Sequence, residues 1–266
     1  MRIIAVANQK GGCGKTTTTV NLAVASAKMG YKVLTVDLDP QGHATLGLGC
    51  NPREIDISVY ESLAQQQVPL SRVIQRTYVS GVDIAPSNIL LSGVETELAI
   101  HQKREYILKQ RLKDLGNLYD ICFLDCSPSL GILTLNALVS CSEVIVPVQT
   151  HYYAIEGLKQ LLETINIVKE RFNSSLRICG VLLTFVETRS LLSRDVQRQA
   201  REFFGDLVFE TVIHKNVRLA EAPSAGESVV TYDENSRGAL EYLALAREIN
   251  NGETKRRTAE KDLLNL

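Results

Sequence analysis

The sequence has no long hydrophobic run, no excess of charge of one sign and no closely paired cysteines. No stretch approaches the roughly 18 to 20 consecutive apolar residues of a membrane-spanning helix, and residues 1–8 become polar too soon for a signal peptide. Lys and Arg total 29 against 30 Asp and Glu. This balance excludes a uniformly basic coat of the histone type but permits a local basic patch. We therefore expect a cytoplasmic globular protein.

Cysteine and histidine are too dispersed to build a metal site from protein ligands alone. The six cysteines include no C-x-x-C pair, and no histidine lies near Cys122 and Cys126, which share a short stretch. The four histidines are equally scattered. Buried, reduced thiols are the favoured interpretation.

Short apolar runs alternate with segments of helical period, which predicts a doubly wound, mostly parallel α/β sheet flanked by helices. The predicted strands are residues 3–7, 32–36, 121–124, 144–148 and 178–185, with weaker candidates at 82–85 and 207–212. The predicted helices are residues 16–29, 155–170, 193–204 and 237–249.

The chain has no Pro-, Gly- or Ser-rich linker and no internal repeat, so residues 1–250 are predicted to form one domain. Residues 251–266 are polar and are predicted to form a flexible tail. A basic amphipathic membrane anchor is the alternative, but the leucines of this tail follow its basic cluster instead of alternating with it. We therefore expect no stable membrane association.

A glycine-rich loop, residues 10–17 with the sequence KGGCGKTT, follows the first predicted strand and opens the first predicted helix. Its glycines let successive backbone N–H groups point into one concavity, which suits an anion. Lys15 would reach the β- and γ-phosphates of a nucleotide, and the Thr16 hydroxyl would bind Mg²⁺. A turn that binds nothing is the alternative, disfavoured because strand, lysine, threonine and helix are all in register. The predicted nucleotide-binding residues are Gly11, Gly12, Cys13, Gly14, Lys15, Thr16 and Thr17.

A second lysine, Lys10, directly precedes the first glycine, and the loop therefore resembles the deviant Walker A motif of the ParA/MinD superfamily of ATPases. The resemblance implies that the chain binds ATP and ADP with Mg²⁺. It also implies a homodimer that encloses two nucleotides, in which Lys10 contacts the phosphates bound by the partner subunit. A solvent-exposed lysine is the alternative.

Asp37 and Asp39 end the second predicted strand in the segment DLDPQG, at the sheet edge where ligands bind in open α/β folds. The segment resembles the D-x-D-P-Q-G motif of the superfamily. This resemblance implies that Asp39 helps to organise the attacking water and the metal shell. Pro40 ends the strand, and Gly42 lets the following loop move, as a nucleotide-sensing switch requires.

Another apolar strand ends in Asp125, as in the Walker B motif, and this aspartate would hold Mg²⁺ through a water molecule. The superfamily pattern D-x-P-P-S-L-G reads DCSPSLG here, so Ser127 replaces one proline. Asn136 in the following helix also matches the pattern, without an assigned role. The predicted catalytic residues are Lys10, Lys15 and Asp39, and the predicted metal-binding residues are Thr16, Asp39 and Asp125.

Residues 209–224, 182–189 and 232–239 resemble segments of the Soj-like ParA partition ATPases. The resemblance implies that basic residues in these segments contact DNA phosphates without reading sequence. His214 and Lys215 stand where the family commonly has Pro and Arg, which replaces a forked donor by a point charge. Solvated surface charges flanked by acids are the alternative. The candidate DNA contacts are Arg189 and Arg218, followed by Lys215 and Arg237.

The resemblance thus implies a slow ATPase that binds double-stranded DNA non-specifically on the nucleoid and drives chromosome or plasmid partition with a stimulating ParB-like adaptor. The sequence leaves two alternative functions: a ParA-like ATPase that positions a protein cargo, and a membrane-associated division-site regulator of the MinD type. An iron–sulfur reductase resembling the nitrogenase iron protein is disfavoured. No cysteine lies between Cys50 and Cys122, and Ile132 occupies the position of the second cysteine that such a reductase needs.

Overall fold

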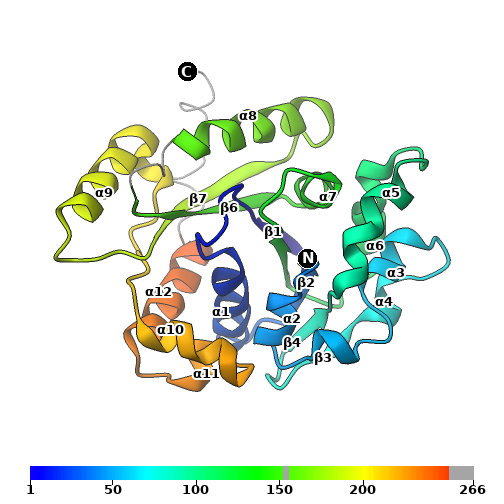
Figure 1. The fold of residues 1–266 in the computed structure, drawn as a ribbon, viewed down its shortest axis with the longest axis horizontal. Coiled ribbons are helices and arrows are strands. Elements are labelled where there is room, and N and C mark those ends of the chain that lie inside the picture. Colours follow the sequence, from blue (N-terminus) through cyan, green and yellow to red (C-terminus); the bar gives the residue numbers. More distant parts are fainter. Residues whose placement is uncertain (152–155, 252–266) are drawn as a thin grey trace.

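The computed structural model describes residues 1–151 and 156–251, and its centre is a seven-stranded sheet (Figure 1). The strand order is β3-β4-β2-β5-β1-β6-β7, and neighbouring strands are parallel except β3 and β4. The predicted doubly wound, mostly parallel sheet is therefore confirmed. The strands are β1 (Arg2–Val6), β2 (Val33–Leu38), β3 (Gln75–Arg76), β4 (Val82–Ala85), β5 (Ile121–Cys126), β6 (Glu143–Gln149) and β7 (Arg177–Thr184).

Helices cover both faces of the sheet. As drawn in Figure 1, α1, α10, α11 and α12 lie below it, α7, α8 and α9 lie above it, and α3 to α6 lie on the side of β3 and β4. The helices are α1 (Lys15–Lys28), α2 (His43–Gly47), α3 (Val59–Ala64), α4 (Leu70–Val73), α5 (Val94–Leu98), α6 (Ile107–Lys113), α7 (Ile132–Ser140), α8 (Glu156–Arg171), α9 (Leu191–Phe204), α10 (Val217–Glu221), α11 (Val229–Tyr232) and α12 (Arg237–Asn251). Residues 252–266, nearly all of the predicted tail, and residue 155 lie outside the described residues.

The sheet divides the interior into two apolar cores because alternate side chains of each strand face opposite sides. In β5, Ile121 and Phe123 join the core under α1 and α12, whereas Cys122 and Leu124 join the core on the other face. Every residue of β5 is buried. This burial explains why the strand is a continuous apolar run instead of an alternating pattern.

The predicted strand at residues 207–212 is wrong. Residues 205–207 form a 3₁₀ turn, and only an isolated bridge between Val181 and Val208 links this segment to the sheet. The Glu248 carboxylate of α12 accepts the backbone N–H groups of Glu210 and Thr211, at 2.8 and 2.9 Å. Helix α12 therefore accepts the backbone N–H groups that would otherwise bond to a neighbouring strand. The apolar residues of this segment are buried without forming a strand.

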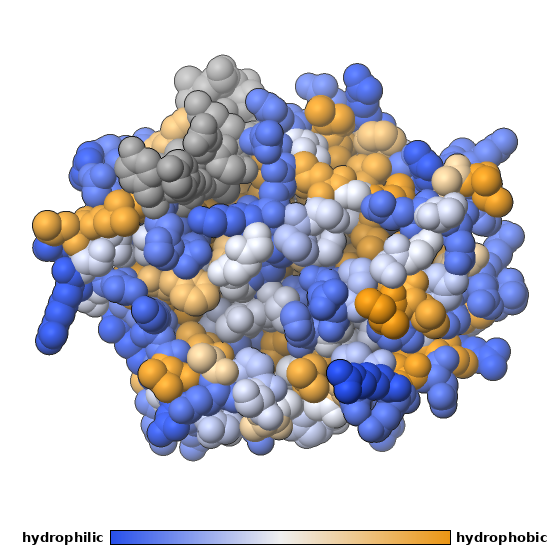
Figure 2. All heavy atoms as spheres, in the orientation of Figure 1, coloured by the Kyte–Doolittle hydropathy of each residue, from blue (hydrophilic) through white to orange (hydrophobic). Residues whose placement is uncertain are grey.

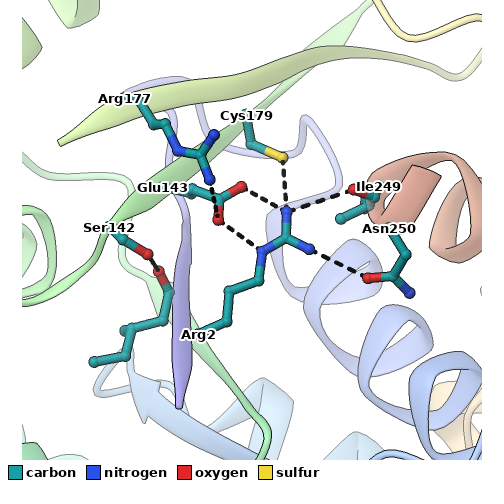
Figure 3. A network of polar contacts seen from close by, with 8 residues as sticks. Arg2, Ser142, Glu143, Arg177, Cys179, Ile249 and Asn250 are labelled. Atoms are coloured by element: carbon teal, nitrogen blue, oxygen red, sulfur yellow. Dashed lines mark hydrogen bonds and ion pairs between the residues drawn. The ribbon is translucent and has the colours of Figure 1, made fainter. Parts of the chain in front are cut away.

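A buried ionic cluster fastens the end of α12 to the amino edge of the sheet (Figure 3). Glu143, whose side chain is 2% exposed, accepts two 2.6 Å hydrogen bonds from Arg2 and pairs with Arg177 at 3.1 Å. Arg2 also donates to the side chain of Asn250 at 3.2 Å and to the Ile249 carbonyl at 3.5 Å. These side-chain contacts cover the amino ends of β1, β6 and β7. The loop that follows β1 lies at the opposite, carboxyl ends of the strands.

The exposed surface mixes polar and apolar residues, and Figure 2 shows the apolar ones scattered over several elements of the face in view. The most exposed large apolar side chains are Ile100, Leu191 and Val217. Within residues 1–151 and 156–251, no helix combines the length and apolarity needed to cross a membrane.

Candidate active site

The loop between β1 and α1 forms an open concavity at the carboxyl edge of the sheet. Gly12 and Gly14 have φ angles of +72° and +88°, a backbone conformation that favours glycine. A Cβ atom built on Gly11 or Gly12 would meet no atom within 4 Å other than those of the adjacent residues in the chain. No side chain caps the N-terminus of α1. The free backbone N–H groups of the first helical turn therefore face a space that suits a phosphate.

Two side chains, one just after β1 and one at the end of β7, hold this loop in place. Asn8 donates to the Pro147 carbonyl at 2.6 Å and accepts the backbone N–H of Lys10 at 3.1 Å. The Thr184 hydroxyl, at the end of β7, donates to the Cys13 carbonyl at 2.9 Å. Neither Asn8 nor Thr184 was a predicted site residue, although Asn8 directly precedes the loop in the sequence.

The two lysines of the loop have different environments. Lys15 is only 6% exposed, and its ammonium donates to the Lys10 carbonyl at 3.0 Å, so its side chain curls back across the loop. The Lys10 ammonium makes no hydrogen bond or ion pair with any residue that the structure describes. The buried thiol of Cys13, within the loop, donates to the same carbonyl at 3.2 Å. Burial raises the pKa of the Cys13 thiol, which disfavours the reactive thiolate.

Asp125 lies directly below the start of α1 and is fully buried. Its two carboxylate oxygens accept hydrogen bonds from the hydroxyl groups of Thr16, at 2.8 Å, and Thr19, at 3.0 Å. The tertiary structure therefore brings together two of the predicted metal-binding residues, Thr16 and Asp125. Thr19 was not predicted, and its position one turn after Thr16 on α1 is the signal that could have found it.

Asp37 is the immediate neighbour of Asp125, because β2 and β5 pair in a register that places the two residues side by side. Asp37 accepts hydrogen bonds from the Thr45 backbone and hydroxyl, at 2.8 and 2.7 Å, and from the Asp39 backbone at 3.1 Å. Burial raises the pKa of Asp37 to about 6. Burial and the nearby charge of Asp37 raise the pKa of Asp125 to about 8. A divalent cation beside this pair would favour its ionised form.

The oxygen donors of this cluster fit Mg²⁺, which prefers carboxylate, hydroxyl and water ligands. Within the described part of the chain, no group of three or more His, Cys, Asp or Glu side chains could hold a metal ion by itself. An ion at Thr16 and Asp125 would therefore take its remaining ligands from phosphate and water, as Mg²⁺ does in nucleotide sites.

Asp39 begins the loop that connects β2 with α2. One of its carboxylate oxygens accepts the Gln41 backbone N–H at 3.0 Å, and the side chain remains partly exposed. Gly42 has a φ of +65°, and a Cβ atom there would lie 2.8 Å from the ring of Pro52. The Thr45 hydroxyl, which donates to Asp37, also accepts the Ser87 backbone N–H at 2.9 Å. The loop is therefore coupled to the ends of β2 and β4.

Side-chain hydrogen bonds stabilise the loop after Asp125 and the helix α7 that follows it. The hydroxyl groups of Ser127 and Ser129 lie 3.1 Å apart. The buried side chain of Asn136 accepts the Leu108 backbone N–H at 3.1 Å and donates to the Arg104 carbonyl at 2.9 Å. Asn136 therefore holds α7 against α6, which gives it a packing role.

A cavity of about 420 Å³ opens beside the phosphate loop. Its wall combines the start of α1, the end of β7, helix α10 with the segment before it, and one residue of α12. Most of its lining is apolar, as expected for a pocket that accepts a flat ring. Residues that face it include Gly14, Thr17, Phe185, His214, Leu219 and Tyr242.

Comparisons with known proteins agree with this geometry. A family model described as an AAA domain matches residues 1–178. The chain is 46% identical over 248 residues to the sporulation initiation inhibitor protein Soj of Bacillus subtilis, covering 93% of this chain and 98% of Soj. It is 42% identical over 248 residues to the chromosome partitioning protein ParA of Myxococcus xanthus, covering 93% and 87% of the two chains.

The chain belongs to the ParA/MinD superfamily. Its curated relatives place it with the Soj-like ParA proteins, so the family expected from the loop motifs is confirmed.

Two solved structures with bound nucleotides support the same family. A cobyrinic acid a,c-diamide synthase from Mycobacterium smegmatis, with an ATP analogue and magnesium, has a TM-score of 0.82 and 37% identity, covering 95% of this chain and 97% of that chain. The septum site-determining protein MinD from Pyrococcus horikoshii, complexed with Mg-ADP, has a TM-score of 0.75 and 26% identity, covering 96% and 98%. This ParA-family chain is therefore a P-loop ATPase that binds ATP or ADP with Mg²⁺.

The candidate DNA contacts of this ParA-family ATPase fall into two groups. Arg189 is exposed and forms no ion pair with the described residues. The other three are paired with carboxylates: Lys215 with Glu187 at 3.1 Å, Arg218 with Glu221 at 2.8 Å and Asp233 at 3.1 Å, and Arg237 with Glu241 at 2.8 Å. A DNA phosphate would have to displace these acids, whereas it could approach Arg189 directly.

Proposed function

We propose that this ATPase forms a homodimer around two ATP molecules and uses nucleotide-dependent, non-specific DNA binding to drive chromosome or plasmid partition. The observation that carries this proposal is the difference between the two lysines of the phosphate loop. Lys15 is turned into its own phosphate loop, whereas Lys10 offers a charged group without a partner among the described residues. A second nucleotide-bearing copy would supply the phosphate that Lys10 lacks.

Each predicted site residue has a role in this proposal. Lys15 and the N–H groups of residues 11–17 bind the β- and γ-phosphates. Thr16 and Asp125 hold Mg²⁺, which when bound would neutralise charge on the phosphates. Asp39, on a loop coupled to the Asp37–Asp125 pair, orients the attacking water. Positioning and charge neutralisation of this kind suffice for phosphoryl transfer, because the protein needs to supply little covalent chemistry.

The nucleobase fits the cavity beside Gly14 and Thr17 in this proposal. Its largely apolar wall would exclude water from the faces of a purine ring. The cavity and the phosphate loop share Gly14, so the base of a nucleotide whose phosphates lie in the loop would be close to this cavity.

The name of one relative, chromosome partitioning protein ParA, and the similarity to Soj support a role in partition. We place the chain in the cytoplasm, on the nucleoid, with a ParB-like adaptor that stimulates a slow ATPase. Arg189 is the first candidate DNA contact because it is exposed and unpaired among the described residues.

Two substitutions test the dimer. Asp39→Ala should bind ATP and hydrolyse it poorly, so light scattering with saturating ATP should detect a stable dimer. Lys10→Ala should bind ATP and stay monomeric. Lys32→Ala, at the opposite edge of the sheet, is the matched control and should behave like the parent. A monomeric Asp39→Ala protein in saturating ATP would contradict the proposal.

Lys15→Ala tests the phosphate loop itself. Loss of a charge that faces the phosphates typically costs several kcal/mol of transition-state stabilisation. ATP hydrolysis by Lys15→Ala should fall by a factor of at least about 100 in a phosphate-release assay. Hydrolysis at the parental rate would exclude this loop as the nucleotide site.

A further inference from the structure

The side chain of His214 is held in one orientation in the wall of the cavity that adjoins the phosphate loop. Its ring Nδ1 lies 2.6 Å from Oε1 of Glu241, and its backbone N–H donates to Oε2 of the same carboxylate at 2.8 Å. Glu241 belongs to α12 and also accepts a 2.8 Å hydrogen bond from Arg237. The His214 and Glu241 side chains are only 14% and 15% exposed.

This two-point contact determines the tautomer of a neutral ring. An ionised carboxylate can only accept hydrogen bonds, so Nδ1 must carry the proton that it shares with Glu241. The other ring nitrogen, Nε2, is then an acceptor. His214 therefore brings a hydrogen-bond acceptor of defined position to a largely apolar cavity.

We propose that His214 makes the site select adenine over guanine, because Nε2 accepts a hydrogen bond from the 6-amino group of adenine. Guanine and hypoxanthine carry a carbonyl oxygen at this position, and two acceptors repel each other. Glu241 is the positioning residue that holds the proton of the neutral ring on Nδ1 and so leaves Nε2 as the acceptor. The inference rests on the proposed placement of the base in this cavity.

A site that offers a fixed polar partner discriminates strongly, because the wrong ligand leaves a buried polar group unpaired. The parent protein should therefore bind ATP about tenfold more tightly than GTP or ITP. Purine riboside triphosphate has no group at position 6 and should bind about fivefold more weakly than ATP. These comparisons need no substitution, so they test the idea even if a variant fails to fold.

His214→Phe keeps a flat ring and removes Nε2. Its preference for ATP over GTP should fall from about tenfold to about twofold, mainly through weaker ATP binding. His101→Phe makes the same substitution at an exposed histidine outside the lining of this cavity. It is the matched control and should keep the parental preference.

Glu241→Gln provides a sharper test because its effect has the opposite sign. The backbone N–H of His214 and the Arg237 side chain both donate to Glu241. The Arg237 side chain is 55% exposed and can turn to solvent, whereas the backbone N–H is fixed. The amide oxygen of the substituted side chain would therefore face the backbone N–H, and the amide NH₂ group would face Nδ1. Nδ1 would then become the acceptor and Nε2 would carry the proton. This tautomer donates to the guanine carbonyl, so the ATP preference should disappear or reverse.

The measurement is competition of each triphosphate, with Mg²⁺, against a fluorescent ATP analogue. An ATP preference that is unchanged in both His214→Phe and Glu241→Gln, or equal binding of ATP and GTP by the parent, would overturn the inference while leaving the ATPase proposal intact. A parent protein that binds no triphosphate would instead refute the proposed nucleotide site.

Discussion

The replacement of Arg189 by Ala tests which basic residues contact DNA. Arg189 is exposed and has no ion pair among the described residues, so a phosphate contact would cost no internal interaction. Each phosphate neutralised by a cationic side chain contributes about −0.9 to the slope of log K against log salt. One contact in each subunit of a dimer therefore makes Arg189 responsible for about 1.8 units of slope.

This difference is large enough to measure. Between 50 and 200 mM salt, a slope difference of about 1.8 units changes the affinity ratio of parent and variant by a factor of about 12. The assay is fluorescence anisotropy with a labelled duplex of unrelated sequence, with ATP present, across a salt series. ATP-driven dimerisation of Arg189→Ala should be unchanged, since the residue lies outside the phosphate loop.

Two further arginines complete the experiment. Arg198→Ala removes the same charge from α9, but Arg198 already pairs with Asp195 and Glu202, so its slope should match the parent. Arg218→Ala should flatten the slope less than Arg189→Ala, because Arg218 must first leave Glu221 and Asp233. Identical salt slopes for Arg189→Ala and the parent would show that the DNA surface lies elsewhere.

Three other changes have defined outcomes. Thr19→Val removes one of the two hydroxyl donors to Asp125, which costs about 1 kcal/mol, so hydrolysis should need several-fold more Mg²⁺; an unchanged Mg²⁺ titration would contradict this. Glu143→Gln should lower the free energy of unfolding by about 2 to 3 kcal/mol at neutral pH, because it removes one partner of a buried ion pair. Burial opposes ionisation, but the hydrogen bonds and charge of Arg2 outweigh it and lower the pKa of Glu143. The stability difference should therefore be full above the unfolded value near 4.5 and shrink as pH falls through the folded pKa, which urea titrations at several pH values would measure. Gly42→Ala forces a left-handed backbone on alanine, at about 1 to 2 kcal/mol, and should lower both the melting temperature and the hydrolysis rate; a parental melting curve would contradict this.

The phosphate loop and the strands that lead to it could be predicted from local sequence. The glycines between two lysines allow the left-handed backbone that the turn between strand and helix adopts. Strand β5 is apolar at almost every position because both of its faces are buried. Neighbouring residues along the chain carry these signals. The ion pairs of Arg218 with Glu221 and of Arg237 with Glu241 also depend on local sequence, since the two members of each pair are three or four residues apart on one helix.

The short helices α2 to α6 gave no comparable signal, because each has only four to seven residues and covers one or two turns. A period of 3.6 residues cannot be recognised over so short a segment. The apolar run at residues 207–212 led to a wrong strand prediction, because a run of six residues does not show how its backbone groups are paired. Burial of its side chains did not depend on strand pairing, and the Glu248 carboxylate satisfied its N–H groups.

The sequence by itself determined the family, most of the strands, the four longest helices and the nucleotide loop, because these depend on residues that are close together along the chain. Only the tertiary structure decided which distant groups share one electrostatic environment. The register of β2 and β5 places Asp37 beside Asp125, and the packing of α12 against the segment before α10 brings Glu241 to His214. Charge, burial and tautomer at these positions depend on through-space neighbours, which no spacing in a linear sequence specifies.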